Sequence, residues 1–78
     1  MKPEVIMYTM PLWPNCARAK QFLSGKGIQF TEKSVLIPKN FKERLKVTNE
    51  PGGPVTVVEE RILMRFSAEE FEEAFKDF

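Results

Sequence analysis

The feature that constrains the fold most is the stretch of residues 10–20, where an apolar run meets a proline-containing turn and the single cysteine of the chain. The run before it, residues 5–9, has no polar residue before Thr9, as is typical of a central strand covered on both faces. Pro14 suits the first position of a helix, because its ring already holds a helical φ and its missing N–H is not needed there. The sequence therefore predicts a strand, a tight turn and a helix over about residues 14–24.

Cys16 falls in the first turn of this predicted helix, where free backbone N–H groups and the helix dipole favour a negative charge. Because the thiolate is the reactive form of cysteine, a thiol at this place is positioned for chemistry. The same residue lies three positions before Ala19 and seven before Leu23, on the predicted buried stripe of the helix. Burial raises the pKa of a thiol, so a reactive and a structural interpretation both stay open, and this spacing favours the structural one.

The middle of the chain predicts a second strand and a short helix. Apolar residues alternate with polar ones over residues 28–35, which is typical of a strand. In a helix over residues 39–47, Phe41 and Leu45 lie four apart and are expected to face inward. The outer face of that helix is then basic, and it consists of Lys39, Lys42, Arg44 and Lys46.

The last third of the chain predicts a hairpin and a final helix. Residues 54–58 are rich in β-branched side chains, residues 59–61 form the turn, and residues 62–64 form the partner strand. Ser67 caps the helix, with Glu70 three residues on in the pattern of a capping box. The core stripe of that helix comprises Phe71, Ala74, Phe75 and Phe78. The element order is βαβαββα, which predicts an α/β fold with a four-stranded mixed sheet and three helices.

Composition excludes several classes of function. The 78 residues predict one domain over residues 1–78, and a single cysteine excludes an internal disulfide framework. Without histidine, a metal site built from protein ligands alone is not expected. Apolar runs are too short for a membrane span, so we expect a cytoplasmic monomer that does not bind membranes. A net charge of +1 argues against nucleic acid as a partner, although basic residues gather before Thr48 and acidic ones after it.

Three segments resemble the glutaredoxin family. Residues 8–16, Tyr-Thr-Met-Pro-Leu-Trp-Pro-Asn-Cys, with Ala-Lys following at 19–20, resemble the active-site turn Tyr-Thr-x-Pro-x-Cys-Pro-x-Cys. Residues 53–58, Gly-Pro-Val-Thr-Val-Val, resemble the turn that carries the cis-proline of the family, in the form found in small bacterial glutaredoxin-like proteins. Residues 64–67 resemble the Gly-Phe turn before the last helix. The resemblance implies a thioredoxin-like fold with strand order 2-1-3-4, parallel first strands and an antiparallel last pair.

The resemblance has one large departure, because Trp13 stands where the family has its attacking cysteine. Only the resolving cysteine survives, as Cys16. This implies poor or absent reduction of disulfides by a two-cysteine cycle, with a role for Cys16 as a single catalytic thiol left open. Trp13 is interpreted as an aromatic platform for a ligand, as a hydrophobic lid over Cys16, or as a mark of decay of the site.

The resemblance also implies a ligand groove. In the family, the residue before the cis-proline offers its backbone to glutathione or to a protein thiol or disulfide, which here assigns that role to Gly53 before Pro54. The expected ligand-binding residues are Trp13, Pro14, Asn15, Gly53, Pro54 and Arg65. Met10, Asn15 and Arg65 depart from the family pattern, so glutathione binding is expected to be weak, and no other cofactor is expected. The alternative is a non-catalytic binding module that holds a peptide or thiol ligand between Trp13 and Pro54.

Overall fold

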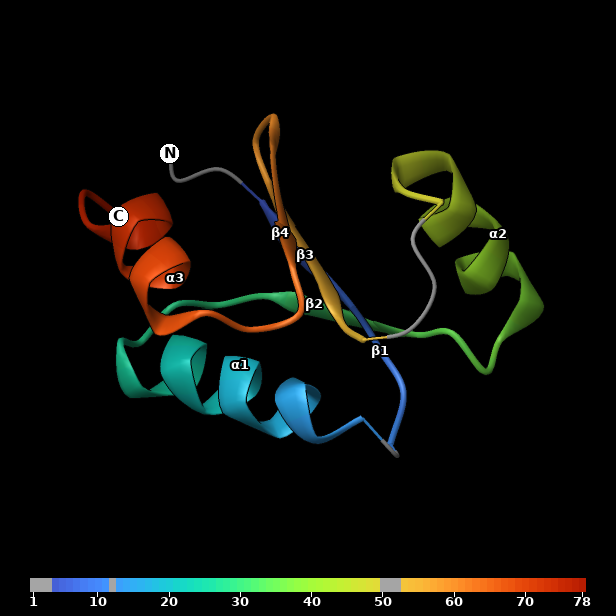
Figure 1. Cartoon of the computed structure of the whole chain (residues 1–78), viewed down its shortest axis with the longest axis horizontal. Helices are drawn as coiled ribbons and strands as arrows, with labels where there is room; N and C mark the ends of the chain where they lie inside the picture. Colours follow the sequence, from blue (N-terminus) through green and yellow to red (C-terminus); the bar gives the residue numbers. More distant parts are fainter. Residues whose placement is uncertain (1–3, 12, 50–52) are drawn as a thin grey trace.

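The computed structural model describes residues 4–11, 13–49 and 53–78, and over these residues the chain forms four strands and three helices (Figure 1). In chain order they are β1 (Val5–Thr9), α1 (Pro14–Gly25), β2 (Thr31–Ser34), α2 (Pro38–Val47), β3 (Val55–Val58), β4 (Arg61–Met64) and α3 (Ala68–Phe75). The predicted order βαβαββα is confirmed. None of the described helices is long and apolar enough to cross a bilayer.

The four strands form one mixed sheet in the order β2-β1-β3-β4, as predicted. β1 pairs parallel to β2, with Ile6 opposite Thr31, and antiparallel to β3, with Ile6 opposite Val57. β3 and β4 pair antiparallel around a turn at Glu59 and Glu60. β1 is thus a central strand, and its buried pattern explains why the sequence has no polar residue before Thr9.

Two predicted boundaries differ from the structure. The second strand was expected over residues 28–35, but β2 is limited to Thr31–Ser34. Ile28 and Val35 are still buried on either side of it, and the Val35 N–H donates to the Thr9 carbonyl at 2.9 Å. Because these flanking residues are buried, apolar and polar residues alternate over a longer stretch than the strand itself. Arg61 belongs to β4 instead of the turn, because the left-handed φ of 55° at Glu59 tightens the reversal.

One face of the sheet is covered by α1 and α3 and holds the larger core (Figure 1). Phe71 is at its centre, with its ring centroid 4.8 Å from that of Phe66 and 5.4 Å from that of Phe22. The predicted stripe of α3 is confirmed, because Phe71 and Phe75 are buried and Ala74 and Phe78 pack against them. The predicted cap is also present: the Glu70 N–H donates to Ser67 Oγ at 3.4 Å.

The other face is covered in part by α2 and holds a smaller core of Tyr8, Val35 and Val55. Here the sequence prediction is wrong. Phe41 and Leu45 are exposed, and Arg44, which was assigned to the outer basic face, is the buried residue of α2. The physical reason is that the guanidinium of Arg44 contacts Trp13 and Gly53, which belong to distant segments. These contacts keep Arg44 on the inward side of α2, so Phe41 and Leu45 face outward.

Candidate active site at the start of α1

Cys16 lies in the first turn of α1, as predicted. Trp13 is the N-cap residue, with extended backbone angles, and Pro14 occupies the first helical position. The Trp13 N–H donates to the Met10 carbonyl at 3.1 Å, and the Cys16 N–H donates to the Trp13 carbonyl at 3.0 Å. These two hydrogen bonds form the tight turn that joins β1 to the helix and fix where the thiol lies.

The Cys16 side chain is buried, with 4% of the residue exposed. Burial raises the pKa of the thiol above its ordinary value, because desolvation penalises the thiolate. A backbone hydrogen bond from Met10 and the charge of Lys20 oppose this shift, whereas the charge of Glu32 adds to it. Burial is the largest of these effects, so the neutral thiol is favoured more strongly than in a free cysteine.

A polar network beside the thiol was not foreseen from the sequence. Lys20 Nζ lies 2.6 Å from Glu32 Oε2, and Thr9 Oγ1 donates to the same carboxylate oxygen at 2.8 Å. The hydrogen bond from Lys20 holds the pKa of Glu32 below its ordinary value. The network joins α1, β1 and β2, and no local pattern signals it because its members are brought together only by the parallel pairing of β1 and β2.

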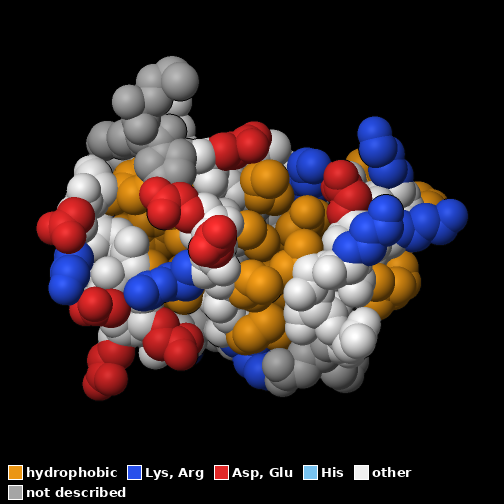
Figure 2. Space-filling view, turned by 90° about the horizontal axis from the view of Figure 1, so that it is seen from above, with side chains coloured by type: hydrophobic (Ala, Val, Ile, Leu, Met, Phe, Trp, Pro, Cys, Tyr) orange, Lys and Arg blue, Asp and Glu red, His pale blue; other side chains and the backbone are white. Residues whose placement is uncertain are grey.

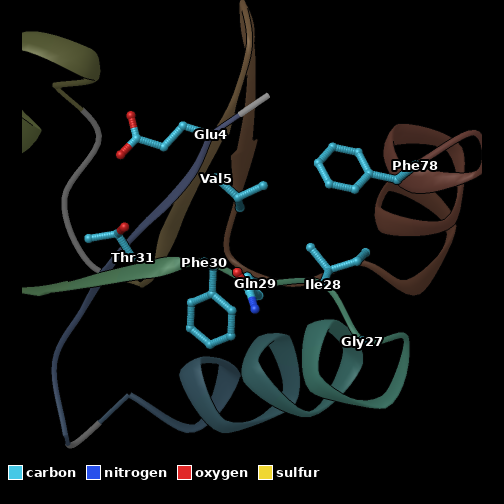
Figure 3. Close-up of a pocket in the computed structure, with 8 residues that line it drawn as sticks. All are labelled: Glu4, Val5, Gly27, Ile28, Gln29, Phe30, Thr31 and Phe78. Atoms are coloured by element: carbon cyan, nitrogen blue, oxygen red, sulfur yellow. The ribbon is translucent and has the colours of Figure 1, made fainter. Parts of the chain in front are cut away.

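A surface hollow of about 430 Å³ borders Cys16, and its lining includes Trp13, Lys20 and Glu32. A larger hollow of about 490 Å³ lies between the start of β1, the segment after α1 and the C-terminal Phe78 (Figure 3). Among the described residues that line it, Glu4 is the only one with an ionisable side chain, and none is a cysteine. Chemistry is therefore assigned to the hollow beside Cys16 and not to the larger one.

Trp13 is half-buried and packs against the smaller core of Tyr8, Val35 and Val55. The guanidinium carbon of Arg44 lies 5.6 Å from the centroid of its ring, which is within the range of a cation–π contact. Arg44 Nη2 also donates to the Gly53 carbonyl at 3.3 Å. Arg44 thus joins two of the predicted site residues, Trp13 and Gly53, and sequence reasoning missed this role because it placed Arg44 on the outer face of α2.

The Gly53–Pro54 bond was expected to be cis, and this prediction is wrong, because no peptide bond among the described residues is cis. Gly53 has a left-handed φ of 75°, which a glycine adopts without strain and which turns the chain into β3. The Pro54 carbonyl accepts a hydrogen bond of 2.7 Å from the Arg65 N–H. The turn is thus held by the glycine conformation and by hydrogen bonds from two arginines.

Arg65 lies against this turn. A Cβ placed on Gly53 would be 2.8 Å from Arg65 Cγ, so a larger residue would displace the Arg65 side chain as well as adopt a strained left-handed φ. The structure therefore brings Trp13, Gly53, Pro54 and Arg65 together, with Arg44 among them. Pro14 is exposed and Asn15 half-buried on the first turn of α1.

The family assignment rests on sequence and on fold. The sequence model of the family described as glutaredoxin matches residues 5–63, which is most of the chain. The protein therefore belongs to the glutaredoxin family. No curated protein matches the sequence.

Solved structures show the same thioredoxin-like fold. The glutaredoxin (grx-1) of Archaeoglobus fulgidus is 23% identical with a TM-score of 0.78, over 91% of this chain and 84% of that one. The glutaredoxin of Brucella melitensis is 27% identical with a TM-score of 0.70, over 94% and 80%. The thioredoxin-like protein BC3987 is 22% identical with a TM-score of 0.73, over 90% and 97%. The predicted fold class is confirmed.

Proposed function

We propose that this protein is a thiol-redox member of the glutaredoxin family that reduces disulfides poorly, and that Cys16 acts alone in whatever exchange occurs. The observation that carries the proposal is the state of the thiol: Cys16 is buried and its pKa is raised. Trp13 occupies the place of the attacking sulfur, and an indole cannot attack a disulfide. Because reduced thiols persist in the cytoplasm, we propose that compartment for its action.

A single thiol can complete a reduction cycle when glutathione is the reductant. The Cys16 thiolate attacks the glutathione sulfur of a mixed disulfide, the old S–S bond breaks, and the substrate sulfur leaves as a thiolate that takes a proton from water. A second glutathione thiolate then attacks the new Cys16–glutathione bond, which releases oxidised glutathione and regenerates the Cys16 thiolate. External glutathione supplies both electrons. A raised pKa leaves a small thiolate fraction at neutral pH, so the first step is slow.

The binding side of the site also supports weak turnover. The Gly53 carbonyl accepts a hydrogen bond from Arg44, and the Pro54 carbonyl accepts one from Arg65. An extended ligand that pairs with this turn meets two carbonyl oxygens that already accept hydrogen bonds, so it gains less from binding there. We therefore propose weak binding of glutathione or of a protein thiol.

The second candidate function is a non-catalytic binding module. The observation that favours it is the Trp13 ring held beside the Arg44 guanidinium, with the exposed Arg65 next to the same turn. An aromatic side chain with the exposed Arg65 near it suits a peptide or thiol ligand that bears a carboxylate. In this case Cys16 serves only to fill the core.

One set of measurements tests the proposal. Alkylation of Cys16 is followed against pH in the folded protein, with the urea-unfolded protein as the reference. We expect a higher midpoint and slower labelling in the folded state. Reduction of a glutathione mixed disulfide is then compared for the wild type, Cys16→Ser and Trp13→Cys. We expect low activity in the wild type, none in Cys16→Ser, and a gain in Trp13→Cys, which adds an attacking thiol with Cys16 left to resolve.

Two outcomes would overturn the ranking. Full activity in the wild type that disappears in Cys16→Ser would show that Cys16 is a competent nucleophile. No wild-type activity, together with saturable glutathione binding that quenches Trp13 fluorescence, would support the binding module instead.

A further inference from the structure

The outward face of α2 carries an apolar strip that includes Phe41 and Leu45, the two residues whose spacing predicted them to face inward. Among the described residues, five large hydrophobic side chains are exposed, and four belong to α2 or the segment before it. They are Leu36 at 65% exposure, Ile37 at 53%, Phe41 at 46% and Leu45 at 43%. Ile37, Phe41 and Leu45 recur every four residues, so they lie along one side of the helix. We call these four residues the α2 apolar strip.

The α2 apolar strip faces outward because the inward side of α2 is held by polar contacts. Asn40 Nδ2 donates to the Ser34 carbonyl at 3.0 Å, and Lys33 Nζ lies 3.1 Å from Glu43 Oε2. Arg44, with 2% exposure, donates to the Gly53 carbonyl. Turning the helix to bury Phe41 and Leu45 would break all three contacts and bring a guanidinium into water. The polar contacts of α2 therefore lie on its inward side, and its apolar side chains face solvent.

The charge beside the α2 apolar strip is positive. Lys39, Lys42 and Lys46 are exposed on the same helix, and its acidic residue, Glu43, is paired with Lys33. Figure 2 shows several Lys and Arg side chains, with hydrophobic ones beside them, at the end of the molecule where α2 lies, and most acidic side chains toward the opposite end. A ligand that covers this face must supply both apolar and acidic groups.

We propose that the outward face of α2 docks an acidic amphipathic helix of a partner protein. Apolar side chains spaced by four residues on the partner would pack against Phe41 and Leu45, and flanking carboxylates would pair with Lys39, Lys42 and Lys46. This docking site is separate from the thiol, and the proposal does not rest on any activity of Cys16.

Charge argues against a second copy of the chain as the occupant of the α2 apolar strip. In a symmetric pair of copies joined through α2, the lysines of one copy would face those of the other, which is unfavourable. An anionic membrane would also suit the lysines, so binding to vesicles is measured beside binding to the acidic peptide. An acidic helix satisfies both the strip and the lysines.

The test uses a synthetic acidic helix of about 20 residues, with leucines at every third and fourth position, glutamates beside them and alanines elsewhere, because alanine favours the helix and a polar face made only of glutamate would repel itself. It is titrated into the isotope-labelled full chain while backbone amide shifts are recorded. We expect shifts confined to residues 36–47, and weaker binding as salt increases. A matched peptide with lysine in place of glutamate should cause no shifts.

Variants of the protein sharpen the test. The double variant Phe41→Ser, Leu45→Ser should weaken binding about tenfold or more, because both apolar anchors are lost. Ile62→Ser is the matched control, since Ile62 is the remaining exposed large hydrophobic side chain and lies on β4; its affinity should not change. Lys42→Glu should weaken binding and flatten the salt dependence. These positions are exposed, so the variants should stay folded.

Four results would overturn the proposal. Peptide-induced shifts on α3 or on the sheet away from α2 would place the site elsewhere, and equal binding of the lysine peptide would remove the role of charge. Binding to anionic vesicles without binding to the acidic peptide would identify a membrane surface. Concentration-dependent association of the protein alone that the Phe41→Ser, Leu45→Ser variant abolishes would identify a second copy as the occupant.

Discussion

The two faces of the sheet bury opposite kinds of side chain. On the α1 and α3 face, aromatic and aliphatic side chains are buried around Phe71, and charged residues point to solvent. On the α2 face, an arginine is buried, and phenylalanine and leucine from the same helix are exposed. Burial of apolar area dominates folding free energy, so the first face should supply most of the stability.

The comparison indicates that the α2 face mainly positions residues of the candidate site, whereas the α1 and α3 face mainly stabilises the fold. Its buried group, Arg44, contacts Trp13 and Gly53, which both belong to the candidate site. A buried charge that keeps its partners is weak support for stability, and we expect Arg44 to act mainly by holding Trp13 and the turn at Gly53 together. Unfolding measurements on variants of the two faces and of the thiol site test this division.

The largest effect should come from Phe71→Ala, compared with Phe41→Ala. Phe71 is fully buried, so its truncation should lower the free energy of unfolding by about 3–5 kcal/mol, a large part of the stability of a small domain. Phe41 is exposed, and its truncation should cost less than about 1 kcal/mol. Urea unfolding followed by circular dichroism measures both. Equal losses would show that the two faces contribute alike.

Arg44→Ala should have the next largest effect. It removes the cation–π contact with Trp13 and the hydrogen bond to Gly53, and it leaves a gap, so the free energy of unfolding should fall by about 1–3 kcal/mol. Arg44→Met, which keeps the aliphatic length without the buried charge, should recover most of this loss. Trp13 fluorescence should change in both variants. If Arg44→Ala unfolds at the same urea concentration as the wild type, Arg44 does not hold this face together.

The third prediction concerns alkaline pH. Because burial raises the folded pKa of Cys16, the neutral thiol favours the folded state fully below the ordinary thiol pKa. That contribution should decrease as pH rises toward the folded pKa, by about 1.4 kcal/mol per pH unit between the two values. The free energy of unfolding is measured against pH for the wild type and for Cys16→Ala, which cancels the tyrosine and lysine titrations. Parallel curves would contradict a buried thiol.

The smallest effect should come from Glu32→Gln. The pKa of Glu32 is lowered, so its contribution to stability is present above the ordinary glutamate pKa and is lost as pH falls through the folded value. The Lys20–Glu32 pair is partly exposed, and the difference from the wild type near neutral pH should stay below about 1 kcal/mol. Unfolding of both proteins at neutral and acidic pH measures it. A difference that grows in acid would reverse the sign we expect.

The sequence by itself determined the elements, their order and the position of the thiol. Those features depend on neighbours within one element: the unbroken apolar run of β1, Pro14 at the start of α1, and Ser67 with Glu70 at the start of α3. The spacing of Cys16 from Ala19 and Leu23 was likewise enough to favour a buried thiol over a reactive one.

The tertiary structure decided which side of α2 is buried, how the chain turns at Gly53, and what surrounds Cys16. Phe41 and Leu45 have the same helical spacing as residues of a buried stripe. The orientation of α2 nevertheless follows from Arg44, whose partners lie in the turns before α1 and β3. The Lys20–Glu32–Thr9 network likewise joins three elements. Periodicity predicts which residues share a face, whereas only contacts between distant segments decide where that face points.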